Sequence, residues 1–218
     1  MPIALFDIDG TLTASNEIDS ICFAEAFVDV FGLSIETDWG SYEHTTDRGI
    51  ATEALVRSGR VASESALSLH RTWFVQLLDQ RMTTLDEIPG ARAFLAALLV
   101  RGWRIALCTG AWSTSARLKL ARAGFPDLPL ASCDDDISRE AILRHGIVLA
   151  GDADDIIVPF GDAPWDVRAA ANLGIAFIGI ASGANAQDLR GHGVLEVFED
   201  FHDAAAVLVA IDAFPRVP

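Results

Sequence analysis

The 218-residue sequence carries little positive charge. It has 16 Lys and Arg against 31 Asp and Glu, a formal net charge of −15 at pH 7, and Lys119 is its only lysine. Because such a chain repels polyanions, we expect neither nucleic acid nor an anionic membrane surface as a partner. No stretch reaches the roughly 18 consecutive apolar residues of a membrane span, so the sequence predicts no membrane segment.

Cysteines are also few. Cys22, Cys108 and Cys133 are scattered and form no Cys-x-x-Cys pair, which excludes a disulfide framework and argues against a zinc site. The N-terminus lacks a basic region followed by an apolar signal core, since Asp7 interrupts it at once. We therefore expect a cytoplasmic protein with reduced thiols. The sequence has no internal repeat or low-complexity tract.

The sequence is rich in apolar residues, at 51% of the chain, which fits a large buried core. The run Ile3 to Phe6 is typical of a buried parallel strand, and Asp7-Ile8-Asp9-Gly10-Thr11 follows it directly. Side chains alternate along an extended chain, so the carboxylates of Asp7 and Asp9 should share one side. The pair suits a nucleophile followed two residues later by a group that transfers protons. In isolation the same pattern also suits an acidic turn, and the remainder of the chain must distinguish these two interpretations.

Apolar runs alternate with segments of helical periodicity along most of the chain. Strands are predicted over residues 3–6, 104–108, 129–132, 155–160, 175–180 and 194–197, with helices over 89–102, 113–123, 138–144, 166–173 and 200–213. Alternation of this kind predicts an α/β fold with a doubly wound, parallel, Rossmann-like sheet.

One long stretch breaks this alternation. Helices are predicted over residues 18–31, 46–58 and 63–82, with no second strand for some seventy residues after the first. Because a crossover in a parallel sheet is normally much shorter, we expect an inserted, all-helical cap subdomain over residues 13–85. The α/β core would then comprise residues 1–12 and 86–218.

Polar side chains follow three of the predicted strands. Asp7 and Asp9 follow the first strand, Thr109 the second, and Asp162 the fourth, with Asp166 four residues later. The carboxyl ends of parallel strands face one edge of a sheet, where ligands bind. Asp7 and Asp162 could hold Mg²⁺, which prefers oxygen ligands, and Thr109 before a helix start suits a phosphate oxygen.

In order and spacing these segments resemble the haloacid dehalogenase superfamily, specifically its phosphoglycolate-phosphatase-like members with a helical cap. The resemblance rests on Asp7-Ile8-Asp9-Gly10-Thr11, Leu107-Cys108-Thr109-Gly110 and Phe160-Gly161-Asp162-Ala163-Pro164-Trp165-Asp166. It implies that Asp7 is the nucleophile and that Asp9 is the general acid and base. It also implies that Thr109, Gly110 and Thr11 contact the phosphate.

The resemblance further implies a Mg²⁺ cofactor, held by Asp7, the main-chain carbonyl of Asp9, Asp162 and Asp166. The family's third motif is usually a lysine that opens a helix after the third strand. Arg139 is the candidate here, although a guanidinium arranges its donors differently from an ammonium. Lys119 falls in the middle of an earlier helix, where we expect a solvated side chain.

Asp9 also discriminates among reactions of the superfamily. Dehalogenases lack the second aspartate, and phosphonate-cleaving relatives use a cap lysine that this sequence does not contain. We therefore expect a Mg²⁺-dependent phosphatase that hydrolyses a small phosphorylated metabolite through an aspartyl-phosphate on Asp7. A phosphosugar mutase and a catalytically idle binding or scaffold member remain as alternatives, and the motifs indicate no oligomeric state.

The densest polar cluster of the predicted cap spans residues 42–49. If the cap closes over the site, His44, Thr46 and Arg48 are candidates to bind the leaving group of the substrate. The alternative interpretation is a helix start, with Thr45 or Thr46 as the N-cap. Both interpretations are consistent with the sequence.

Overall fold

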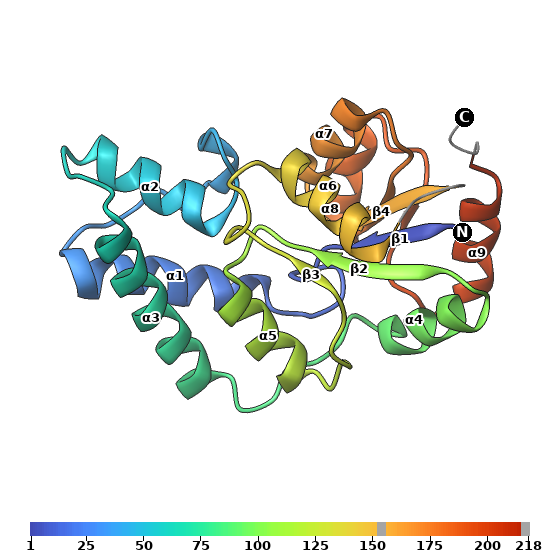
Figure 1. The fold of residues 1–218 in the computed structure, drawn as a ribbon, viewed down its shortest axis with the longest axis horizontal. Helices are drawn as coiled ribbons and strands as arrows, with labels where there is room; N and C mark the ends of the chain where they lie inside the picture. The colour runs from blue at the N-terminus through green and yellow to red at the C-terminus, as the bar shows by residue number, and fades with distance from the viewer. Residues whose placement is uncertain (152–155, 215–218) are drawn as a thin grey trace.

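The computed structural model describes residues 1–151 and 156–214. These residues form one six-stranded sheet of order β3-β2-β1-β4-β5-β6, in which every pair of neighbours is parallel. The strands are β1 (Ile3–Phe6), β2 (Arg104–Cys108), β3 (Leu130–Ala131), β4 (Ile157–Gly161), β5 (Ile178–Ile180) and β6 (Val197–Phe198). Figure 1 shows the sheet with helices on both faces, which confirms the predicted α/β class.

Strand β1 lies at the centre of the sheet. Its last residue, Phe6, is in register with Leu107 of β2 on one side and Phe160 of β4 on the other. The chain builds one half of the sheet outward from β1 and then crosses to β4 to build the other half. The carboxyl ends of β1 and β4 therefore meet at the topological switch point, where open α/β sheets bind ligands.

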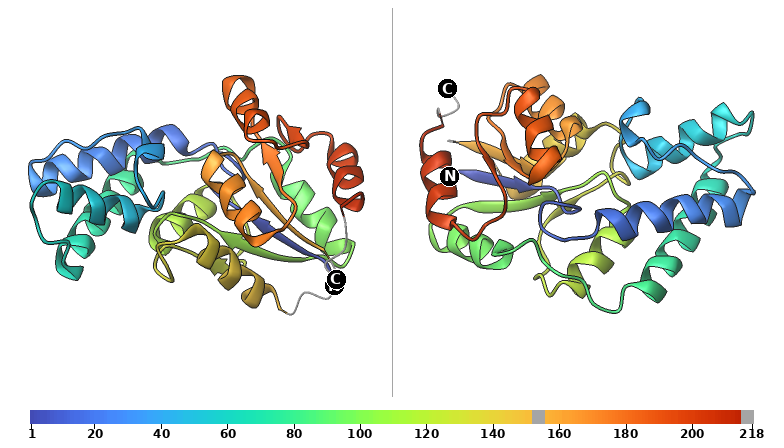
Figure 2. Two further views of the ribbon diagram at one scale, coloured as in Figure 1. Left: turned by 90° about the horizontal axis from the view of Figure 1, so that it is seen from above. Right: turned by 180° about the vertical axis from the view of Figure 1, so that it is seen from behind.

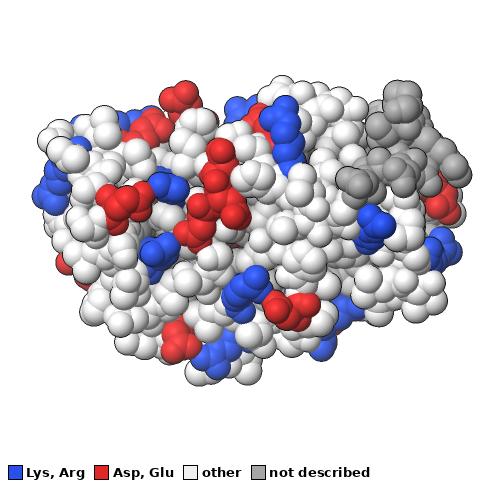
Figure 3. Space-filling view, viewed as in Figure 1, with Lys and Arg blue, Asp and Glu red and all other residues white. Residues whose placement is uncertain are grey.

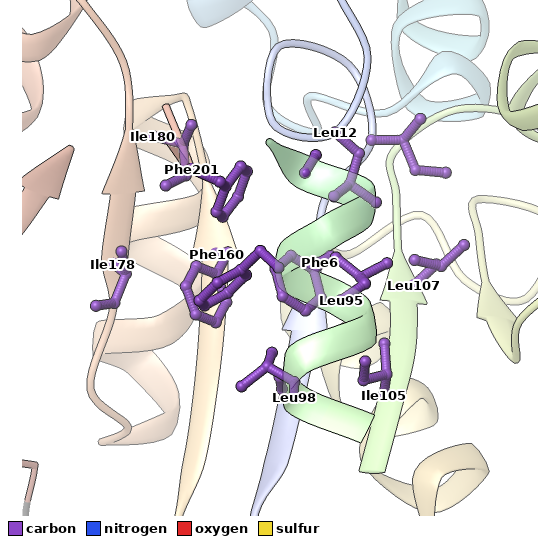
Figure 4. Packing of buried hydrophobic residues seen from close by; sticks show 14 of the residues in the cluster. Phe6, Leu12, Leu95, Leu98, Ile105, Leu107, Phe160, Ile178, Ile180 and Phe201 are labelled. Atoms are coloured by element: carbon purple, nitrogen blue, oxygen red, sulfur yellow. The ribbon is translucent and has the colours of Figure 1, made fainter. Parts of the chain in front are cut away.

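The two faces of β1 pack against different helices. Phe6 stacks on Phe160, with ring centroids 4.4 Å apart (Figure 4). Phe6 also meets Phe94 edge-on. Ile3 and Leu5 face the opposite side, toward a second cluster of buried side chains. The helices of the α/β part are α4 (Ala91–Val100), α5 (Ser113–Arg122), α6 (Arg139–Ala150), α7 (Pro164–Leu173), α8 (Gly183–Gly191) and α9 (Ala204–Asp212).

Three α-helices intervene between β1 and β2. They are α1 (Asn16–Phe31), α2 (Asp47–Arg57) and α3 (Glu64–Arg81), with a short 3-10 helix η1 (Trp39–Ser41) between α1 and α2. Figures 1 and 2 show these inserted helices beyond one end of the sheet. Their interior is aromatic: Phe23 packs edge-on against Phe74 and against buried His70. Burial lowers the pKa of His70 to about 4, so its ring is neutral at pH 7.

The chain enters and leaves the inserted helices through two adjacent segments. The Ile88 N–H donates to the Leu12 carbonyl at 2.8 Å, and the Ala14 N–H donates to the Asp86 carbonyl at 2.9 Å. These pairings lie at the predicted limits of the cap, residues 13 and 85. That division of the chain stays a prediction, and it is taken up with the proposed function.

The structure differs from the sequence prediction in several elements. Helices α8 and η1 were not predicted, since α8 buries only Ala186 and Leu189 and its sequence shows no apolar stripe. Helix α6 continues to Ala150, six residues beyond its predicted end. The predicted fourth strand began at Asp155, which lies outside the described residues. No described helix combines the length and the apolar character needed to span a membrane.

Candidate active site

The predicted strand-end residues lie around one cavity. Asp7 follows β1, Thr109 follows β2 and Asp162 follows β4, and all three line a cavity of about 600 Å³. The inserted helices form its opposite wall through Phe23 and Trp39. The structure thus brings together residues that are more than 150 positions apart in the sequence.

Three carboxylates converge at this cavity: Asp7 and Asp162 line it, and Asp166 is buried beside them. Asp7, Asp162 and Asp166 each place an oxygen within 4.8 Å of the others. Burial and then repulsion by Asp166 raise the pKa of Asp7 well above its usual value, and the same two causes raise that of Asp162 to about 7. Asp166 Oδ2 is buried and has no hydrogen-bond partner among the described residues. An oxygen-only donor set with excess negative charge fits a divalent cation such as Mg²⁺.

Gly10 permits the approach of Asp162 to the first motif. It adopts φ of +78°, and a Cβ at this position would lie 2.1 Å from Asp162 Oδ2 and 2.3 Å from Asn16 Nδ2. The Asn16 side-chain amide in turn donates to Asp162 Oδ2 at 2.8 Å. Any side chain here would be strained and would displace the Asp162 carboxylate.

Arg139 partly balances the acidic cluster from the first turn of α6. Its Nη1 donates to Asp7 Oδ1 at 3.2 Å and lies 3.5 Å from Asp166 Oδ1, and its Nε donates to the Thr45 carbonyl at 3.2 Å. Burial opposes its charge, but the attraction of Asp166 and Asp7 raises the pKa of Arg139. The guanidinium therefore lies where the third motif was predicted, beside the candidate nucleophile.

Thr109 and Gly110 line the cavity as predicted, whereas Thr11 does not. The Thr109 hydroxyl accepts a hydrogen bond from the Ala111 N–H at 3.1 Å, within the turn that precedes α5. Thr11 is fully buried, and its hydroxyl has no hydrogen-bond partner among the described residues. The turn at Gly10 directs Thr11 away from the cavity, so the structure does not place it with the other predicted phosphate contacts.

Lys119 corrects a prediction. Its side chain is 0% exposed, and its Nζ donates to Asp9 Oδ1 and Oδ2 at 2.7 and 2.6 Å and to Asp19 Oδ1 at 2.7 Å. The expectation of a solvated lysine was wrong, because Lys119 lies on the buried face of α5 with Ala116 and Leu120. That helical spacing was visible in the sequence, whereas the partner Asp19 on α1 was not.

The polar cluster over residues 42–49 divides between two roles. Thr46 caps α2, since its hydroxyl accepts a hydrogen bond from the Gly49 N–H at 3.2 Å, which confirms the helix-start interpretation. Thr45, Thr46 and Asp47 line the cavity, but His44 and Arg48 do not. Arg48 instead pairs with Glu64 at the start of α3.

The acidic run Asp134 to Asp136 lies in the loop between β3 and α6, and Figure 3 shows acidic side chains gathered near this loop. Asp134 of this run has partners in two other elements. It pairs with Arg71 of α3 at 2.8 Å and accepts hydrogen bonds from the backbone and hydroxyl of Ser113. These contacts connect the loop to α3 and to the start of α5.

Known proteins share this arrangement of sequence and fold. The profile of haloacid dehalogenase-like hydrolases matches residues 1–174. A phosphoglycolate phosphatase from Cereibacter sphaeroides (strain ATCC 17025 / ATH 2.4.3) is 28% identical over 96% of this chain and 100% of its own length. A hydrolase from Pseudomonas syringae superposes with a TM-score of 0.79 at 21% identity, covering 97% of this chain and 99% of its own. For CbbY from Rhodobacter sphaeroides, solved in complex with phosphate, the TM-score is 0.72 at 19% identity, with coverage of 91% and 94%.

Proposed function

Because this chain belongs to the haloacid dehalogenase-like hydrolase family, we propose that it is a Mg²⁺-dependent phosphatase acting on a small phosphomonoester, with Asp7 as the nucleophile. One observation carries the proposal: Asp7, Asp162 and Arg139 line one cavity at the switch point of the sheet, and the Asp166 carboxylate lies beside all three. A carboxylate nucleophile needs cationic partners to approach an anionic phosphate, and this cluster provides both kinds of group.

The carboxylates of Asp7, Asp162 and Asp166 and the main-chain carbonyl of Asp9 would hold the metal ion. When bound, Mg²⁺ supplies positive charge that aligns the phosphate and offsets the repulsion between these acids. Asp166 Oδ2, which has no hydrogen-bond partner in the described part of the chain, and the raised pKa of Asp162 support this assignment.

The residues of the chain divide the remaining chemistry among them. A carboxylate oxygen of Asp7 attacks phosphorus, and the bond from phosphorus to the ester oxygen breaks as Asp9 donates a proton to the departing alcohol. Arg139, beside Asp7 at 3.2 Å, neutralises charge on the transferring group. Thr109 and Gly110, which line the cavity just before α5, hold its oxygens. Asp9 then takes a proton from the water that hydrolyses the aspartyl-phosphate.

The inserted helices would act as the cap and provide the leaving-group side of the cavity. Phe23, Trp39 and Ile50 contribute apolar surface there, next to Thr45, Thr46 and Asp47. A cavity of about 600 Å³ suits a small metabolite and is too small for a macromolecule. The 28% identity to a phosphoglycolate phosphatase along the whole chain supports 2-phosphoglycolate as the first ester to test.

A panel of small phosphate esters tests the proposal, with release of inorganic phosphate as the readout. We expect Mg²⁺-dependent hydrolysis that Asp7→Asn abolishes, and trapping with a fluoride analogue of phosphate at Asp7. Activity that survives Asp7→Asn or removal of the metal would contradict the mechanism. Isomerisation of a sugar phosphate with a bisphosphate requirement would identify a mutase, and inactivity of the folded, Mg²⁺-bound protein on every ester would indicate a binding protein.

A further inference from the structure

Lys119 contacts Asp9 from the side that faces away from the cavity. It is the only lysine of the chain, and its ammonium lies within 2.7 Å of three carboxylate oxygens, two on Asp9 and one on Asp19. An ammonium has three N–H donors, so these two acids account for all of them. Burial opposes the charge, but Asp19, Asp9 and Asp47 together raise the pKa of Lys119. The side chain is therefore a buried cation.

Ser15 fixes the same carboxylate from a second direction. Its hydroxyl donates to Asp9 Oδ1 at 2.5 Å and lies 2.7 Å from the Thr13 hydroxyl, which itself donates to the Ile8 carbonyl at 3.1 Å. Both oxygens of Asp9 thus receive hydrogen bonds from the protein, although Asp9 still lines the cavity. Its side-chain orientation is set by groups that lie on the protein side of the cavity wall.

The network also crosses from the α/β part to the inserted helices. Lys119 and Asp9 belong to the α/β part, whereas Asp19 lies on α1. Asp47, at the start of α2, accepts a hydrogen bond from the Trp112 N–H at 2.9 Å, just before α5. Asp19 on α1 thus binds a side chain of α5, and Asp47 on α2 binds the residue that precedes α5. A shift of α1 against α5 would alter the surroundings of Asp9.

We propose that Lys119 is a positioning residue that holds the Asp9 carboxyl at the leaving-group side of the cavity and couples it to α1 through Asp19. This inference rests on the proposed function, in which Asp9 transfers the proton to the alcohol. Lys119 does not line the cavity, so it acts through Asp9 and not on the substrate. A fold that needed only a filled core would be served as well by an apolar side chain, since burying an ion pair carries a large desolvation cost.

The dependence of rate on the leaving group tests this inference. The quantity to measure is kcat/KM, which includes departure of the alcohol but not the later hydrolysis of the phosphorylated enzyme. An aryl phosphate with an acidic phenol needs little protonation of its leaving group, whereas an alkyl phosphate needs a positioned acid. We expect Lys119→Met to lower kcat/KM about 100-fold for the alkyl ester and less than about fivefold for the aryl ester.

Arg122→Met is the matched control. Arg122 lies three residues further along α5 and forms an ion pair with Asp79 of α3 at the surface. The control removes a cation from the same helix without touching Asp9, so both esters should be hydrolysed as by the unchanged protein. A Lys119→Met variant that loses activity equally on both esters would show a general structural defect and would overturn the inference.

Two further variants keep the test decisive. In an Asp9→Asn background, adding Lys119→Met should change kcat/KM by no more than about twofold for the alkyl ester and for the aryl ester. The effects of substitutions at two residues that act as a unit do not add. If Lys119→Met fails to fold, Asp19→Asn replaces it: this change removes one carboxylate that holds the ammonium, and the loss should again be larger for the alkyl ester. Equal losses would overturn the inference, whereas hydrolysis that survives Asp7→Asn would instead overturn the proposed function.

Discussion

Arg139 Nη1 lies 3.2 Å from Asp7 Oδ1, and Arg139 is the first residue of a helix that begins more than 130 residues after Asp7 in the chain. The cation on α6 and the candidate nucleophile after β1 therefore form a direct ion pair. The Cζ of the same guanidinium lies 2.9 Å from where a Cβ would stand at Gly110. The position of the arginine is thus constrained by the second motif as well as by the first.

Removing the charge of Arg139 should impair phosphoryl transfer. We expect Arg139→Met to lower kcat by about 100-fold or more, because charge on the transferring group would lose a buried cation. Arg139→Lys should retain more activity than Arg139→Met, since it keeps the charge while losing the second contact, to the Thr45 carbonyl. Steady-state kinetics on one ester measures both variants, and equal activity of the methionine variant and the parent would contradict the assigned role.

Divalent cations should stabilise the protein through the three carboxylates. We expect millimolar Mg²⁺ to raise the melting temperature, because a ligand that binds only the folded state adds to its stability. Asp162→Asn should weaken this shift, and Asp134→Asn, which changes an acid outside the cavity lining, should preserve it. If Mg²⁺ raised the melting temperature of the parent, Asp162→Asn and Asp134→Asn equally, the cation would bind elsewhere. Calorimetric titration gives the affinity independently of activity.

Stability without a cation should depend on pH through Asp162. Burial first, and then Asp166, raise its pKa to about 7, so the folded protein holds a proton there that the unfolded chain has already released. The contribution of Asp162 to stability is therefore present below its ordinary pKa and is lost as the pH rises toward 7. Relative to the parent, Asp162→Asn should gain stability across this range in the presence of EDTA.

Denaturant unfolding of both proteins at several pH values between 4 and 7.5 measures this difference. The lowered pKa of His70, about 4, makes a contribution of opposite sign, but it is common to both proteins and cancels in the comparison. Mg²⁺ should remove most of the pH dependence of the difference in free energy of unfolding between the parent and Asp162→Asn. A difference that stays constant with pH would contradict the raised pKa of Asp162.

Substrate contacts should come from the residues that line the cavity and not from Arg48. The ion pair between Arg48 and Glu64 lies at the surface, and neither residue lines the cavity. We expect Arg48→Ala to change kcat/KM by less than about twofold, since exposed ion pairs contribute little energy. Trp39→Ala, which removes apolar surface from the cavity wall, should raise KM. A large effect of Arg48→Ala would restore its predicted role in binding the leaving group.

The sequence by itself determined the parallel α/β class, the succession of six strands along the chain and the identity of the acids at the strand ends. It could do so because each depends on a local pattern: apolar runs for buried strands, helical spacing for helices, and polar residues directly after a strand. Asp7, Asp9, Thr109 and Asp162 were identified in this way. Arg139 was predicted only through the resemblance to the family, whose third motif opens a helix after the third strand.

Only the tertiary structure decided which side chains meet across the cavity. Lys119 was predicted to be solvated because its partner Asp19 lies 100 positions away on α1, and no local pattern brings a distant carboxylate to a buried ammonium. The same reason explains why His44 and Arg48 were predicted at the site, while the structure places Phe23, Trp39 and Asp47 in its wall. The packing of α1 and α2 against the carboxyl edge of the sheet sets these contacts, and that packing depends on the whole chain.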